Sequence, residues 1–163
     1  MQVVFLPGLR AEKGQLRSGS GTGHEVHAGS FIHGRKVVLE SGLAARPREL
    51  ARVLVHEVFH FVWLRVGNPL RRSYERLLET EMARQAWGEL GWSAESRKRS
   101  LRIVDRLRRS RRWREYVCES FCDSAAWLLA GLRAHEEFTL ALGHRRARRE
   151  WFQRMLARDE ISI

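Results

Sequence analysis

The sequence predicts an α+β fold, in which a small N-terminal antiparallel sheet precedes a mainly helical part. Short β-type runs separated by glycine-containing turns fill the chain up to residue 42, whereas apolar residues recur at helical spacing from residue 47 onward. The chain has 163 residues, 44% of them hydrophobic, and no repeat or long linker divides it. We therefore expect one domain over residues 1–163, with the sheet and the first helix in residues 1–66 and further helices in residues 67–163.

Three strands are expected, at residues 2–6, 24–32 and 36–40. The second and third strands read as a hairpin that turns at His33 and Gly34. The third strand comes shortly before the first helix, and we expect it to lie at an edge of the sheet. An extended substrate peptide could then add to it as a further strand.

Five helices are expected in the rest of the chain. The first begins near Pro47, which suits the first turn of a helix, and Glu49 follows there to meet the positive end of the helix dipole. Apolar residues cover most sides of this helix, which predicts a buried central position. Ser93 fits a helix N-cap, and glycines fit several helix ends. The predicted helices span residues 47–66, 70–90, 93–109, 112–130 and 144–157.

The chain is strongly basic. Its formal net charge is +11, and arginine supplies almost all of the positive charge. Such a charge favours acidic partners, which include nucleic acid, anionic lipid and acidic protein. Arginines crowd residues 97–114 and 145–149, and no nucleic-acid recognition motif accompanies them. We interpret both stretches as solvated helix faces that attract an acidic partner, with nucleic acid as the alternative. The first stretch also contains an apolar strip of Leu101, Ile103, Val104 and Leu107.

The sequence gives no sign of export or of a membrane span. Residues 1–8 lack a basic leader, and the longest strongly apolar stretch, residues 125–132, is much shorter than the roughly 20 residues of a spanning helix. Cys118 and Cys122 lie four positions apart in a helical pattern, which fits small reduced packing residues better than a disulfide or a zinc pair. We therefore expect a cytoplasmic protein without a membrane partner.

A short motif at residues 54–63, LVHEVFHFVW, carries chemistry. It places His56 and His60 one turn apart on the same helix face, where both imidazoles can reach one zinc ion at about 2 Å. Glu57 lies about 100° further round the helix and can contact a water molecule beside that ion. The pattern H-E-x-x-H on a helix is a signature of zinc metallopeptidases. A simpler interpretation, two hydrogen-bonded core histidines beside a surface glutamate, is disfavoured because three polar groups in an apolar helix need a partner.

A third protein ligand is expected from elsewhere, because catalytic zinc sites commonly use three protein ligands and leave a position for water. Residues 117–129, VCESFCDSAAWLL, place Glu119 and Asp123 four apart on an otherwise apolar helix. We predict that Glu119 is the third ligand and that Asp123 accepts the far ring N–H of His56. The alternative is an amphipathic helix whose solvent face carries both carboxylates. The rival third ligands are Glu75, Glu79, Glu81 and His135.

This order of motifs resembles the gluzincin branch of zinc metallopeptidases, to which thermolysin belongs. The stretch ESFCDSAAWLL also resembles the second zinc helix of compact bacterial zincins, including the ImmA/IrrE-like group. The resemblance covers residues 36–66 and 115–130, and the separation between His60 and Glu119 is longer than in the thermolysin type. It implies a zincin-like domain in which both motif histidines and Glu119 hold zinc and Asp123 supports a histidine ligand.

The predicted function is that of a zinc-dependent metallopeptidase acting on a peptide or protein substrate. Zinc would activate a water molecule, and Glu57 would act as the general base. A second group often stabilises the oxyanion, and the candidates are Tyr116, His135 and His144. The alternative function is that of a regulatory protein with a zincin-like fold that binds nucleic acid or a partner protein, with narrow or lost peptidase activity.

Overall fold

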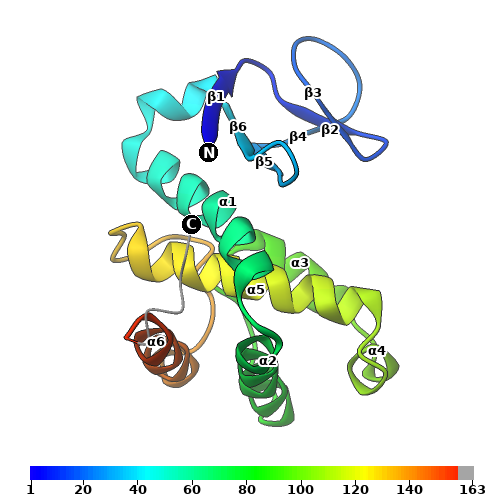
Figure 1. The fold of residues 1–163 in the computed structure, drawn as a ribbon, viewed down its shortest axis with the longest axis vertical. Helices are drawn as coiled ribbons and strands as arrows, with labels where there is room; N and C mark the ends of the chain where they lie inside the picture. The colour runs from blue at the N-terminus through cyan, green and yellow to red at the C-terminus, as the bar shows by residue number, and fades with distance from the viewer. Residues whose placement is uncertain (158–163) are drawn as a thin grey trace.

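The computed structural model of the chain describes residues 1–157, which form a small β part and a larger helical part (Figure 1). This arrangement confirms the predicted α+β fold. The predicted single domain extends to residue 163, and residues 158–163 lie outside the described residues. Among the described helices, none combines the length and the apolar composition needed to cross a membrane.

Three strands form the sheet that packs on the first helix. They are β1 (Gln2–Leu6), β5 (Ala28–Phe31) and β6 (Lys36–Glu40), in the order β1-β6-β5. β6 pairs parallel with β1 and antiparallel with β5, so the sheet is mixed and not purely antiparallel as predicted. The prediction that residues 36–40 lie at an edge is wrong as well. Residues 37–39 are at most 3% exposed, and such a continuous buried apolar run is typical of a central strand.

A second sheet of three very short strands lies beside the first. It contains β2 (Arg10–Glu12), β3 (Gln15–Arg17) and β4 (His24–Glu25), in the order β3-β2-β4. The strand predicted at residues 24–32 is therefore two strands, β4 and β5, which belong to different sheets. β2 and β3 were not predicted because they are short and mostly polar. The tight turn that joins them includes Gly14, whose φ of 76° is the conformation that a two-residue hairpin turn requires.

The helical part agrees with the predicted helices at residues 47–66, 112–130 and 144–157, apart from one or two residues at their ends. A short 3-10 helix, η1 (Ser41–Ala45), links β6 to the first of them. The described helices are α1 (Pro47–Arg65), α2 (Asn68–Ala83), α3 (Trp92–Ser100), α4 (Ile103–Leu107), α5 (Arg111–Leu129) and α6 (Leu142–Leu156).

Two predicted helices differ from the structure. The second ends at Ala83 and not at residue 90, because Gln85 adopts a left-handed conformation with φ of 55° that an α-helix cannot continue through. The helix predicted at residues 93–109 is divided into α3 and α4. The Asp105 carboxylate accepts the backbone N–H of Arg102 at 2.9 Å, so a new helix is capped where one long helix was expected.

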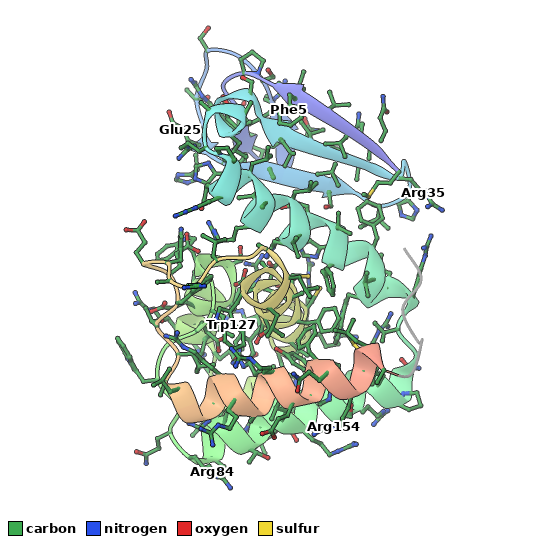
Figure 2. All side chains as sticks on the ribbon, turned by 90° about the vertical axis from the view of Figure 1, so that its left-hand side faces the viewer. Phe5, Glu25, Arg35, Arg84, Trp127 and Arg154 are labelled. Atoms are coloured by element: carbon green, nitrogen blue, oxygen red, sulfur yellow. The ribbon has the colours of Figure 1, made fainter. Side chains whose placement is uncertain are left out.

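α1 lies between the sheet and α5, and α2 and α6 lie on the far side of α5 (Figures 1 and 2). Toward the sheet, Phe61 packs in one apolar cluster with Val37 and Leu39 of β6. Toward α5, Phe59 packs against Phe121 with ring centroids 5.7 Å apart. α1 is therefore the buried central helix that the sequence predicts, and its motif is held between two packed layers.

Candidate metal centre

Two histidines of α1 bring one ring nitrogen each to the same place. Nε2 of His60 lies 3.2 Å from Nε2 of His56, and the ring planes meet at 78°. His56 is 9% exposed, and His60 is half-buried. Residues four apart share one face of a helix, so both imidazoles project from the same side of α1. The motif thus provides two nitrogen donors aimed at one position.

Glu119 of α5 supplies an oxygen at that position. Its Oε2 atom lies 3.3 Å from Nε2 of His56 and 3.9 Å from Nε2 of His60. Two ligands that each lie about 2.0–2.1 Å from a tetrahedral zinc ion are about 3.3 Å apart, so these three atoms fit one such ion after a small adjustment. The Glu119 side chain is 13% exposed, and the alternative in which it faces solvent is therefore wrong.

Glu57 also comes close to both histidines. One of its carboxylate oxygens lies within 4.8 Å of their ring nitrogens, so distance alone leaves it as a competing ligand. However, Oε2 of Glu57 accepts a 2.5 Å hydrogen bond from the hydroxyl of Ser30 on β5, and the same hydroxyl lies 3.0 Å from the Glu57 carbonyl oxygen. Ser30 holds Glu57 on the sheet side, whereas Glu119 approaches the nitrogens from α5, so Glu119 is the candidate third ligand and Glu57 lies beside it.

Asp123 of α5 orients His56. Its Oδ1 atom lies 2.7 Å from Nδ1 of His56, and its Oδ2 atom accepts a 2.9 Å hydrogen bond from the N–H of Ala94 in the first turn of α3. With the proton on Nδ1, Nε2 presents its lone pair to the ligand position. Burial disfavours the charged imidazolium, but the Asp123 carboxylate outweighs burial and holds the pKa of His56 well above its ordinary value. This is the contact predicted for Asp123.

Gly91 allows α3 to approach Asp123 this closely. A Cβ atom at this position would lie 2.5 Å from Oδ2 of Asp123, which is shorter than real Cβ contacts. The φ of Gly91 is 180°, an extended conformation that any residue can adopt. Glycine is therefore needed at position 91 because a larger side chain would collide with the Asp123 carboxylate, and not because of the backbone conformation.

His60 has a thiol as the partner of its second nitrogen. The Sγ atom of Cys118 lies 3.6 Å from Nδ1 of His60, and Cys122 lies one helical turn further in the apolar core. The pKa of Cys118 is lowered to about 6, mainly by its hydrogen bond with Cys122 and to a smaller extent by its contact with His60. Burial raises the pKa of Cys122 well above its ordinary value. These three residues form a second group of potential metal ligands, with donor atoms within 4.8 Å of one another. Of these three residues, His60 lines a cavity beside His56, and neither cysteine does.

Arg97 of α3 holds the other oxygen of Glu119. Its Nη2 atom lies 3.0 Å from Oε1, and its Nη1 atom donates to the Ser93 carbonyl at 3.0 Å. Burial disfavours the carboxylate, but the hydrogen bond to His56 and the nearby positive charges keep the pKa of Glu119 below its ordinary value. Sequence reasoning missed Arg97, because nothing in the sequence distinguishes it from the other arginines of residues 97–114.

Two cavities adjoin His56 on the sheet side. One of about 400 Å³ is lined by residues of β5, both motif histidines, Glu57 and Glu119. The other, of about 460 Å³, is lined by residues 24–28, Arg52 and Trp92. Glu57 lines both cavities, and the cavity of about 400 Å³ is lined by His56, His60 and Glu119 together.

The rival third ligands lie elsewhere, and those predictions are wrong. Ion pairs with arginines engage Glu75 and Glu81, and His135 contacts Glu49 at 3.1 Å. Glu79 lies on α2, and no residue of α2 lines either cavity. The spacing along the chain could not reveal these pairings, because each of them depends on how the helices pack.

The three predicted oxyanion-stabilising residues also lie outside both cavities, which corrects that prediction. Tyr116 is 1% exposed, and its hydroxyl donates a 2.6 Å hydrogen bond to Glu89 in the core. His144 lies in the first turn of α6, and His135 is held by Glu49. Arg97 is the cationic side chain that lines the cavity containing all three ligand residues.

In comparisons with known proteins, no family model matches the chain, and neither the curated proteins nor the solved structures give a significant match. Function must therefore be inferred from the site itself.

Proposed function

We propose that the chain is a zinc-dependent metallopeptidase. The observation that supports this most is the convergence of Nε2 of His56, Nε2 of His60 and Oε2 of Glu119 within 3.2–3.9 Å of one another. Two imidazoles and one carboxylate from a second helix are a donor set typical of catalytic zinc, which keeps a further position open. The adjoining cavity of about 400 Å³ provides access to such a position.

Zinc bound by this set would supply a Lewis acid that acidifies water and polarises a carbonyl group. Glu57 is placed to do the proton transfer, because it is buried beside the ligand position and its carboxylate is held by Ser30. It would remove the proton from the attacking water and then deliver a proton to the departing amine. Asp123 would keep His56 in the tautomer that binds metal, and Arg97 would keep a single oxygen of Glu119 turned toward the histidines.

β5 is the strand best placed to bind an extended peptide. It pairs with β6 on one side, and among the described strands it has no partner on the other. Ala28, Gly29 and Ser30 of β5 line the cavity that contains the ligand atoms. A peptide added to this edge would therefore run past Glu57, with backbone hydrogen bonds fixing its direction. This replaces the prediction that residues 36–40 receive the peptide.

The test compares wild type with Glu57→Gln, which keeps the size of the side chain and removes the base. We expect both proteins to bind zinc stoichiometrically, and the variant to hydrolyse an unstructured protein about 10²- to 10⁴-fold more slowly. Glu115→Gln is the matched control, because Glu115 lies on the surface of α5, where it pairs with Arg111. Zinc content is measured by elemental analysis and hydrolysis by peptide release.

A wild-type protein that binds no zinc, or that binds zinc and shifts DNA in gels without cleaving any peptide, would contradict the peptidase proposal. The second result would favour the regulatory alternative.

A further inference from the structure

A short helix flanked in the chain by arginines, which we call the apolar tip, lies at an outer corner of the helical part, near the N-terminal end of α5 (Figure 1). It consists of α4, whose Ile103 and Leu107 side chains are 74% and 72% exposed and whose Val104 is 45% exposed. The sequence groups these three residues with Leu101 as the apolar strip of one predicted helix, and in the structure all three are exposed. Of that strip, Leu101 packs against the core.

Basic residues dominate the sequence around this tip. Residues 97–114 contain ten basic residues and one acidic residue, Asp105. Asp105 is turned inward, where it accepts hydrogen bonds from the backbone of Arg102 and from Ser110. Several arginines of the tip form no ion pair within residues 1–157, so their charge is available to a partner. These are Arg102, Arg106, Arg108 and Arg112.

The shape and chemistry of the tip favour a membrane over a nucleic acid as the acidic partner. A nucleic acid would contact the arginines, but protruding aliphatic side chains add nothing to phosphate binding, and single strands favour aromatic stacking surfaces. Trp113, the one aromatic residue within residues 97–114, is 0% exposed. A bilayer with anionic lipid accepts a protruding aliphatic side chain among its acyl chains and binds the surrounding arginines with its head groups.

We propose that α4 and its flanking arginines form a docking surface for an anionic membrane, with Ile103 and Leu107 inserting between the head groups. The expectation of no membrane partner depended on the absence of a spanning segment, which a surface contact does not need. This inference is independent of the metal centre, because α4 and the arginines Arg102, Arg108 and Arg112 line neither cavity beside His56.

The test is co-sedimentation of the full chain with vesicles of phosphatidylcholine, with and without phosphatidylserine. Wild type should bind only the vesicles that contain phosphatidylserine, and added salt should weaken binding. Ile103→Ser/Leu107→Ser keeps every charge and should lower the partition coefficient at least about tenfold, because two apolar side chains no longer insert. Arg106→Gln/Arg108→Gln should lower it roughly fivefold for each arginine.

Leu64→Ser/Leu142→Ser is the matched control, since both leucines are exposed, at 52% and 79%, but lie on α1 and α6. Its binding should equal that of wild type, and circular dichroism should show the same thermal unfolding for all variants. Two outcomes would overturn the proposal, namely no binding to anionic vesicles and an equal loss of binding in the control variant. If the protein does not bind vesicles but binds DNA, and Ile103→Ser/Leu107→Ser leaves DNA binding unchanged, the arginines serve a nucleic acid instead.

Discussion

Replacing Gly91 with alanine would place a methyl group against the Asp123 carboxylate. The added Cβ would lie 2.5 Å from Oδ2, whereas ordinary contacts begin at 3.4 Å. The carboxylate must therefore move by about 1 Å, since non-bonded carbon contacts are optimal at about 3.5–4.0 Å. The bond from Nδ1 of His56 to Oδ1 is 2.7 Å long, and such a shift takes it outside hydrogen-bonding distance.

The expected result is a weaker metal site. Losing a hydrogen-bond partner of a ligating histidine typically lowers metal affinity about 10- to 100-fold. This corresponds to roughly 1.4–2.7 kcal/mol. The dissociation constant for zinc is measured by competition with a coloured chelator, for wild type and for Gly91→Ala. Gly143→Ala is the matched control, because a Cβ on this α6 glycine meets nothing within 4 Å.

A second pair of variants isolates the cause. Asp123→Ala removes the group that the new methyl would displace, so Gly91→Ala/Asp123→Ala should bind zinc no more weakly than Asp123→Ala alone. If Gly91→Ala binds zinc as tightly as wild type, Asp123 does not position His56. If the two substitutions reduce affinity independently, the methyl group acts through some other contact, and the reasoning is refuted.

Three further substitutions test other parts of the structure. Ser30→Ala should lower kcat/KM about 10- to 100-fold, because it removes one hydrogen bond to the charged Glu57 carboxylate, and it should leave zinc affinity unchanged. Steady-state kinetics and a zinc titration measure the two quantities. A loss of zinc affinity alone would contradict the role of Ser30 in positioning Glu57. Glu119→Ala should weaken zinc binding more than about 100-fold in the same chelator assay, and unchanged affinity would remove Glu119 from the ligand set. Glu89→Gln leaves the fully buried Arg148 without one carboxylate and should lower the free energy of unfolding by about 3 kcal/mol near neutral pH, measured by urea denaturation. Burial favours the neutral acid, but Arg148 holds the pKa of Glu89 below 4.5. The stabilisation by Glu89 is therefore present above pH 4.5 and is lost as the pH falls below it. If the free energy of unfolding of Glu89→Gln falls with decreasing pH as much as that of wild type, Glu89 is not the group responsible.

The sequence was most informative where one helix determines the geometry. Four-residue spacing placed His56 beside His60 and Glu119 near Asp123, because each pair shares one helix face. The burial of α1 followed from its apolar composition, and the positions of α5 and α6 followed from helical periodicity.

The sequence was least informative where separate segments meet. β1 pairs in parallel with β6, from which it is separated by about thirty residues of chain. The local sequence pattern predicted the hairpin of β5 and β6, but a pattern of that kind cannot reveal pairing between distant segments. The roles of Ser30, Gly91 and Arg97 depend on contacts with Glu57, Asp123 and Glu119, which lie more than twenty positions away in the chain. Tyr116 was a candidate to stabilise the oxyanion because of its position in the sequence, but in the folded chain its hydroxyl donates a hydrogen bond to Glu89 in the core.

The central claim is that one zinc ion is held jointly by His56, His60 and Glu119. Crystals grown with zinc, with X-ray data collected on both sides of the zinc absorption edge, test it most directly. One anomalous peak is expected at about 2.0–2.2 Å from both Nε2 atoms and from Oε2 of Glu119. A peak bound instead by Cys118 and Cys122, or no peak at all beside the histidines, would contradict it.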